Sequence, residues 1–160
     1  MTGLRRCLPL LLALALLGGC GVLGSIKGKL GIGPAHAALR SLTVTADPGA
    51  NQGNGTQLDI VVVYGSDTAA RLPKTGPDWF RQRDALRVQL AKDIAVISEE
   101  VDTPSASFKV ALPRDTRKKG LAVYAFANYA APEGWPPITL TPYKHATLRL
   151  QPTSIAIAEK

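Results

Sequence analysis

The side chains that could carry out catalysis or bind a metal are few and scattered. The two histidines, His36 and His145, have no Cys, Asp or Glu neighbours at metal-ligand spacing. The adjacent acids Glu99 and Glu100 would point to opposite faces of a strand, so they form no general acid/base pair. The segment 65–67 lacks the G-x-S-x-G pattern of a nucleophilic serine and is typical of a turn. The sequence therefore predicts no enzyme, no metal site, no cofactor and no small-molecule substrate.

The N-terminal residues have the order of an export signal. Arg5 and Arg6 precede an apolar run over residues 8–17, and Gly18 and Gly19 follow it. This run of ten residues is too short to cross a bilayer as a helix, which takes roughly 20 residues. The run is therefore predicted to be a signal peptide rather than a permanent membrane span.

The residues at the end of this signal could carry a covalent modification. The order Leu17-Gly18-Gly19-Cys20 resembles the lipobox of bacterial lipoproteins, which implies removal of residues 1–19 and a lipid on Cys20. Gly21 stands where an aspartate would, in enterobacteria, indicate retention in the inner membrane, so the outer membrane, facing the periplasm, is the expected location. Two or more acyl chains hold a protein stably on a bilayer. The simpler alternative is an ordinary signal peptide with an incidental cysteine.

The charge that remains after export gives little sign of a polyanionic partner. Loss of residues 1–19 takes away Arg5 and Arg6 and lowers the formal charge from +7 to +5. The other basic residues form no stripe with interleaved aromatic residues, so nucleic acid is not an expected partner. A local cluster over residues 114–119 could contact anionic lipid or glycan, but a solvated turn is the simpler interpretation.

The mature chain is predicted to consist of a tether and one domain. Residues 20–40, the lipidated cysteine and a Gly- and Ala-rich stretch, show no sustained periodicity and are expected to be a flexible tether. Residues 41–160 alternate between apolar and polar side chains, with one helical stretch at about 77–92. The expected strands are 41–46, 58–64, 94–101, 107–112, 121–129, 146–151 and 155–157. This pattern favours a mainly β fold, a two-sheet β-sandwich with a short helical insertion, in which 58–64 is central and 94–101 is an edge strand.

One predicted loop is longer than the fold requires. Residues 47–57 are polar and glycine-rich, whereas strands of a sandwich can be joined by two to five residues. Long loops on a rigid scaffold often carry recognition. This segment is therefore the candidate binding site.

The order of these features resembles the TssJ (SciN) family of outer-membrane lipoproteins of the bacterial type VI secretion system. The likeness rests on the lipobox, a first strand ending in Ala46-Asp47-Pro48, the loop leading into LDIVVVYGSD, the helical Trp79-Phe80, the strand from Phe108 to Pro113, and LAVYAFANYAAPEGW ending in Trp135. The resemblance implies a transthyretin-like sandwich. It also implies a structural subunit of the secretion membrane complex that binds the periplasmic C-terminal part of a TssM-type inner-membrane protein.

In that family the loop between the first two strands makes much of the contact with the partner. Carried over by position, this role falls on Asp47, Gly49, Asn51, Gln52, Gly53, Asn54, Gly55, Thr56 and Gln57, with Asn51, Gln52 and Asn54 expected to make polar contacts.

Two other functions fit an exported lipoprotein. One is a pilotin that escorts a secretin to the outer membrane. The other is a lipoprotein that binds glycan or peptidoglycan through Tyr124, Trp135 and Tyr143, although packing in or around the core is the simpler interpretation of these rings.

Overall fold

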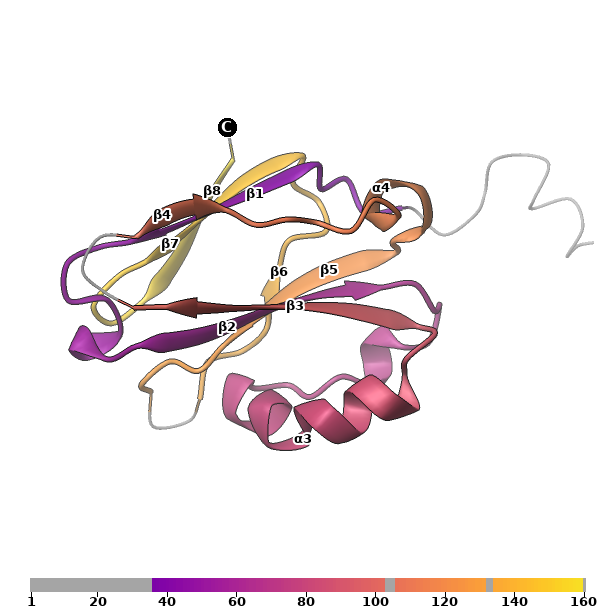
Figure 1. Ribbon diagram of the computed structural model, residues 1–160, viewed down its shortest axis with the longest axis horizontal. Helices are drawn as coiled ribbons and strands as arrows, with labels where there is room; N and C mark the ends of the chain where they lie inside the picture. Colours follow the sequence, from indigo (N-terminus) through magenta and orange to yellow (C-terminus); the bar gives the residue numbers. More distant parts are fainter. Residues whose placement is uncertain (1–35, 103–105, 132–133, 160) are drawn as a thin grey trace, which may run out of the picture. The chain divides into compact units, whose positions relative to one another are not determined.

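Two four-stranded sheets face each other in the computed structural model, which describes residues 36–102, 106–131 and 134–159 (Figure 1). The first sheet has the strand order β4 (Ser107–Lys109), β1 (Ser41–Ala46), β7 (His145–Leu150) and β8 (Ile155–Glu159). The second sheet has the order β3 (Ile94–Val101), β2 (Thr56–Val63), β5 (Ala122–Ala127) and β6 (Ile138–Thr139). The predicted two-sheet β-sandwich is confirmed.

Strand β1 shows why the sequence folds this way. Leu42, Val44 and Ala46 alternate with half-exposed polar residues and point into the space between the sheets. β1 pairs in parallel with β7, so that Leu42 lies beside Ala146 and Val44 beside Leu148 on the same buried face. One side of the strand therefore faces the core and the other faces solvent, as its period of two predicts.

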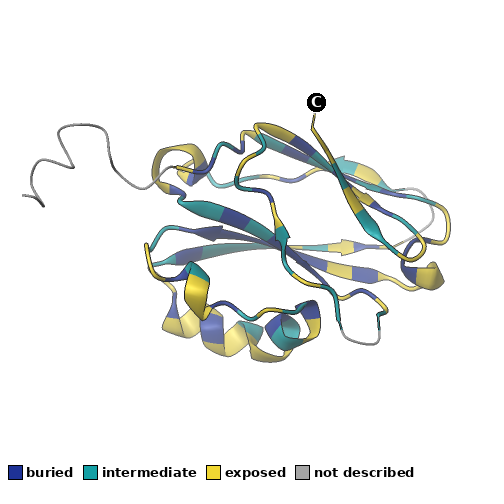
Figure 2. Ribbon diagram, turned by 180° about the vertical axis from the view of Figure 1, so that it is seen from behind, coloured by how far each residue is buried: buried dark blue, intermediate teal, exposed yellow. Residues whose placement is uncertain are grey.

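The second sheet is covered on both faces, which explains the continuous apolar sequence of β2. Ile60 and Val62 belong to the core between the sheets, whereas Val61 and Val63 belong to a second cluster beneath the helix α3 (Gly76–Gln89). Figure 1 shows this helix lying along the outer side of the sheet, and Figure 2 shows the resulting band of buried residues. The predictions that β2 is central and that β3 lies at an edge are both confirmed.

Helix α3 starts and ends at identifiable residues. The Thr75 side chain caps it by accepting a hydrogen bond from the Asp78 amide at 3.2 Å, and Pro77 occupies its first turn, where proline is tolerated. The helix ends at Gln89, three residues before the predicted end at Lys92. There the carbonyl of Leu90 accepts hydrogen bonds from the amides of Asp93 and Ile94, which turns the chain directly into β3.

Several elements differ from the prediction. β4 is shorter than the predicted strand 107–112. The Val110 amide still donates a hydrogen bond to the Leu42 carbonyl, but after Val110 the chain turns away from β1. The predicted turn after it contains a short helix, α4 (Thr116–Lys119). Two 3-10 turns, η1 (Ala50–Gly53) and η2 (Ala69–Arg71), and the two-residue strand β6 were not predicted, because elements this short show no periodicity.

The folded domain begins before residue 41, so the predicted tether is too long at its C-terminal end. Ala37 and Leu39 are fully or almost fully buried and belong to the core. Their segment is held by backbone hydrogen bonds from Ala37 to Gly120, from Ala38 to Thr141 and from Arg40 to Lys144. These bonds are with residues distant in sequence, which is why the local pattern did not reveal them.

The predicted signal peptide, Cys20 and the tether as far as residue 35 lie outside the described residues. Within the described residues, no helix has both the length and the apolar character needed to span a bilayer.

Candidate partner-binding site

The β1–β2 loop, Asp47 to Gly55, lies at the end of the sandwich away from the point where the chain enters it. The described chain enters at Ala37, beside Gly120 at the end of α4, and β1 then runs the length of its sheet to η1 at the opposite end (Figure 1). The β7–β8 turn and the start of the β5–β6 connection lie beside η1. The candidate site is therefore built from three loops on a two-sheet scaffold.

Backbone hydrogen bonds fasten the β1–β2 loop to the β7–β8 turn. The amides of Asp47, Asn51 and Gln52 donate to the carbonyls of Leu150, Gln151 and Pro152, at 2.8, 3.1 and 2.9 Å respectively. Internal bonds from Ala50 to Asp47 and from Gly53 to Gly49 close the loop on itself. A loop with this many backbone bonds has little conformational freedom left to lose when a partner binds.

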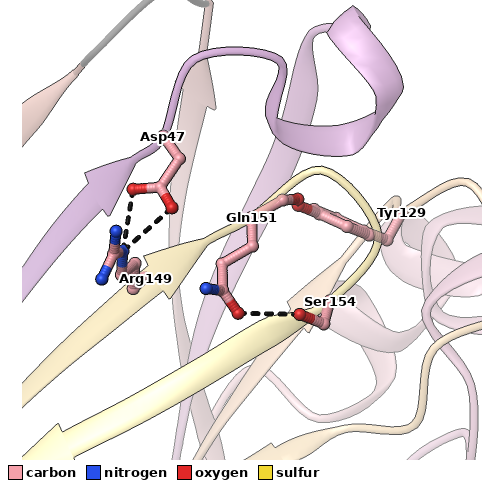
Figure 3. Close-up of polar contacts among 5 residues, drawn as sticks. All are labelled: Asp47, Tyr129, Arg149, Gln151 and Ser154. Carbon is pink, nitrogen blue, oxygen red and sulfur yellow. Dashed lines mark hydrogen bonds and ion pairs between the residues drawn. The ribbon is translucent and has the colours of Figure 1, made fainter.

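An ion pair at the start of the loop adds a side-chain connection to β7. The Arg149 guanidinium lies 2.8 and 3.0 Å from the two carboxylate oxygens of Asp47 (Figure 3). The Asp47 carboxylate raises the pKa of Arg149, because it accepts a hydrogen bond from the guanidinium and attracts its charge. Asp47, predicted to contact a partner, is thus already paired within the domain.

Asn51 is buried and organises the loop, so its side chain does not lie at the surface for the predicted partner contact. Only 2% of the residue is exposed. Its side-chain amide donates to the carbonyls of Gly55 and Asn128, both at 3.2 Å, and its side-chain oxygen accepts from the Ala130 amide at 2.6 Å. Its φ of 52° lies in the left-handed region, which asparagine tolerates better than most residues.

Tyr129 is the residue of this site that sequence reasoning missed. Its hydroxyl donates to the carbonyl of Gln151 and accepts from the Asn51 amide, while its ring packs against Trp135 with 5.8 Å between ring centroids. Burial raises the pKa of the phenol. A tyrosine at the end of an apolar strand requires a buried hydrogen-bond partner, and that was the signal available in the sequence. Ser154 completes the cluster in Figure 3 by donating to the Gln151 side chain at 2.8 Å.

The surface that the loop offers to a partner is smaller than predicted. Thr56 and Gln57 belong to strand β2 rather than to the loop, and Thr56 is buried. Asn54 is exposed, but its side chain donates to the Asn51 carbonyl at 3.0 Å. Gln52 is exposed, with a φ of 57°, and its side chain makes no hydrogen bond to the described residues. The accessible part of the loop therefore includes Gln52, Asn54 and the exposed glycines Gly49, Gly53 and Gly55.

A buried carboxylate beneath α3 has a structural role. Asp59 on β2 is 1% exposed, accepts a 2.8 Å hydrogen bond from the Trp79 indole and lies 3.8 Å from the Arg83 guanidinium. It is fully engaged in docking the helix. Across residues 36–102, 106–131 and 134–159, no three His, Cys, Asp or Glu side chains come together as metal ligands.

The three aromatic residues considered for glycan binding do not form a shared platform. Tyr124 packs against the cluster beneath α3, whereas Trp135 and Tyr143 pack against the core between the sheets. All three are half-buried.

The fold can be compared with known proteins. No protein-family model matches the sequence, and no curated protein matches it. Among solved structures, the model is similar to the type VI secretion lipoprotein TssJ1 from Pseudomonas aeruginosa, with 13% identity and a TM-score of 0.55 over 76% of this chain and 95% of that one. The chain has the TssJ fold. It is also similar to Serratia marcescens Lip, a membrane-bound component of the type VI secretion system, with 11% identity and a TM-score of 0.50 over 75% of this chain and 96% of Lip.

The TssJ fold therefore covers nearly all of the described domain. The loop that contains η1 and its two neighbouring loops lie at one end of this fold, so the candidate site lies at that end and on neither sheet face.

Proposed function

We propose that this chain is a lipid-anchored structural subunit of a type VI secretion membrane complex. Cys20 would hold it in the outer membrane, and the β1–β2 loop would bind the periplasmic C-terminal part of a TssM-type inner-membrane protein. The proposal is supported by the lipobox-like residues 17–20 and by a TssJ fold that covers almost the full length of two type VI secretion proteins.

The observation that carries the docking proposal is a rigid loop at the end of the sandwich away from the chain entry. β1 spans six residues, or about 20 Å at roughly 3.3 Å per residue, between Ser41 and Ala46. A domain anchored through residues before Ala37 would present η1 on the side away from its membrane. The loop's backbone bonds to Leu150, Gln151 and Pro152 would lower the entropic cost of binding.

Binding to the TssM-type periplasmic fragment tests this function. The chain from residue 20 onward, carrying Cys20→Ser, would be titrated calorimetrically with the periplasmic C-terminal fragment of a TssM-type protein from the same organism. Deletion of residues 49–55 is expected to abolish binding. Gln52→Ala is expected to weaken it about tenfold, the loss typical of one central polar contact.

Gln82→Ala is the matched control, because Gln82 is an exposed glutamine on α3, away from the loop. It should leave the affinity unchanged. Intact binding after the deletion would overturn the docking proposal. Capture of a secretin C-terminal segment in place of the TssM-type fragment would identify a pilotin instead.

The anchor is tested separately. Mass spectrometry of the exported protein should find acyl chains on Cys20 as the first residue, and an unmodified cysteine or a different N-terminus would overturn this part of the proposal.

A further inference from the structure

A basic hollow lies at the end of the sandwich where the chain enters. It has a volume of about 190 Å³ and is lined by Leu39, Arg40, Leu112, Pro113, Arg114, Thr116 and Arg117. One of its three arginines comes from the entering segment, and two come from the connection between β4 and β5. The fold therefore brings together arginines that are distant in the sequence.

These positive charges are not neutralised within the described part of the chain. Arg40, Arg114 and Arg117 make no ion pair with the described residues. The one carboxylate in the sequence between Leu112 and Gly120 is Asp115, and it is bound to Lys119 at 2.9 Å. Since like charges brought together repel each other, an anion in the hollow would relieve this repulsion.

A buried hydroxyl group borders the same hollow. Thr116 is only 2% exposed, and its side-chain oxygen is closed off from solvent beside the Tyr64 hydroxyl, so it is not available to a ligand in the hollow. Guanidinium groups bind phosphate with two parallel hydrogen bonds, so the exposed arginines Arg40, Arg114 and Arg117 are the groups that could hold an anion here.

We propose that this hollow binds the phosphate group of an anionic phospholipid and so seats the α4 end of the sandwich on the bilayer. Leu39 and Arg40 follow directly on the segment that leads back to the proposed lipid anchor, and α4 lies at the opposite end from η1 (Figure 1). The inference rests on the anchor in the proposed function. Membrane contact at α4 would orient the partner-binding loop away from the membrane.

Vesicle binding by a chain without lipid tests the hollow alone. The chain from residue 20 onward, carrying Cys20→Ser, would be sedimented with phosphatidylcholine vesicles that do or do not contain phosphatidylglycerol. Preference for the anionic vesicles is expected. Arg114→Gln together with Arg117→Gln should weaken this binding about thirtyfold, because each basic side chain at an anionic surface contributes roughly a fivefold factor.

The matched control is Arg87→Gln with Lys92→Gln, which removes the same charge from exposed positions at and just after the end of α3. If the control lost as much vesicle binding, the total charge of the protein alone would explain the binding. That result would overturn the proposal that the hollow binds phosphate.

Two results would assign the hollow differently. Equal binding to both kinds of vesicle would overturn the proposal. Thermal stabilisation by inorganic phosphate without any preference for phosphatidylglycerol would indicate a free anion and would likewise overturn it. Neither result concerns the TssM-type partner. The Arg114→Gln/Arg117→Gln protein should bind that partner with unchanged affinity in calorimetry. The membrane-contact proposal and the partner-binding proposal can therefore fail independently.

Discussion

At the scale of single residues, the candidate site depends on side chains that are not accessible to a partner. Asn51 connects its loop to Gly55, Asn128 and Ala130, and Tyr129 connects the same loop to Gln151. Of the exposed side chains in the loop, Asn54 donates to the Asn51 carbonyl, whereas Gln52 makes no hydrogen bond to the described residues. Substitutions at the buried pair and at Gln52 should therefore have different consequences, the first for stability and the second for binding.

Asn51→Ala is expected to lower the free energy of unfolding by about 3 kcal/mol. It leaves the Ala130 amide and two carbonyl groups without partners, and it places alanine in a left-handed conformation. Asn51→Gly is the control, because glycine accepts this φ and should recover the backbone part of the loss. Urea denaturation measures both, and an Asn51→Ala protein as stable as the parent would contradict the role given to this side chain.

Tyr129 should make stability sensitive to alkaline pH. Because burial raises the pKa of the phenol above its ordinary value of about 10, the folded state holds the proton more tightly than the unfolded chain. The stabilisation is thus complete below about pH 10 and is lost as the pH rises through the folded-state pKa. Tyr129→Phe should reduce this loss, measured as the free energy of unfolding between about pH 8 and about pH 11. Tyr64, whose pKa burial also raises, would account for the remainder.

At the scale of elements, α3 is the addition that closes the outer face of the second sheet. Its docking combines a stack between Trp79 and Phe126, with 4.7 Å between ring centroids, and the hydrogen bond from Trp79 to the buried carboxylate of Asp59. The helix thus supplies both the apolar cover and the polar partner that the central strand β2 needs.

Trp79→Phe is expected to destabilise the domain by about 3 kcal/mol, since it leaves the buried Asp59 carboxylate without its nearest donor and creates a small cavity. Val88→Ala, on the exposed side of the same helix, should change stability by less than about 0.5 kcal/mol. Chemical denaturation compares the two, and equal effects would show that the helix is not docked through Trp79.

The elements also show what the sequence could and could not predict. β1 and β3 were predicted with the observed bounds, and in β1 six residues of strict alternation suffice to identify a half-buried strand. The loop between β1 and β2 was predicted from the sequence, but the burial of Asn51 in it was not. That burial depends on Tyr129 and on the β7–β8 turn, which are distant in sequence. The contribution of Arg40 to a hollow with Arg114 and Arg117 was unpredictable for the same reason.

At the scale of the whole molecule, the two ends of the sandwich have different proposed tasks, one on the membrane and one at the partner. Cys20→Ser should leave the sandwich folded, because the core is formed by residues from Ala37 onward, yet it should release the protein from the membrane fraction and abolish secretion. Cell fractionation with a secretion assay measures this. A fully functional Cys20→Ser strain would contradict the anchor mechanism.

Strand β1 joins these two ends, and this position gives it a mechanical consequence. It is hydrogen-bonded to β4 on one edge and to β7 on the other, and these bonds run across the direction in which the strand lies. A pull between Ala37 and Gln52 would be carried by the covalent backbone of β1, which is already extended, so it would place little load on the hydrogen bonds to β4 and β7. A pull that peels the edge strand β8 away from β7 would break bonds one after another. In single-molecule stretching, the first direction should require the larger unfolding force, so the sandwich would be strongest along the line between anchor and partner.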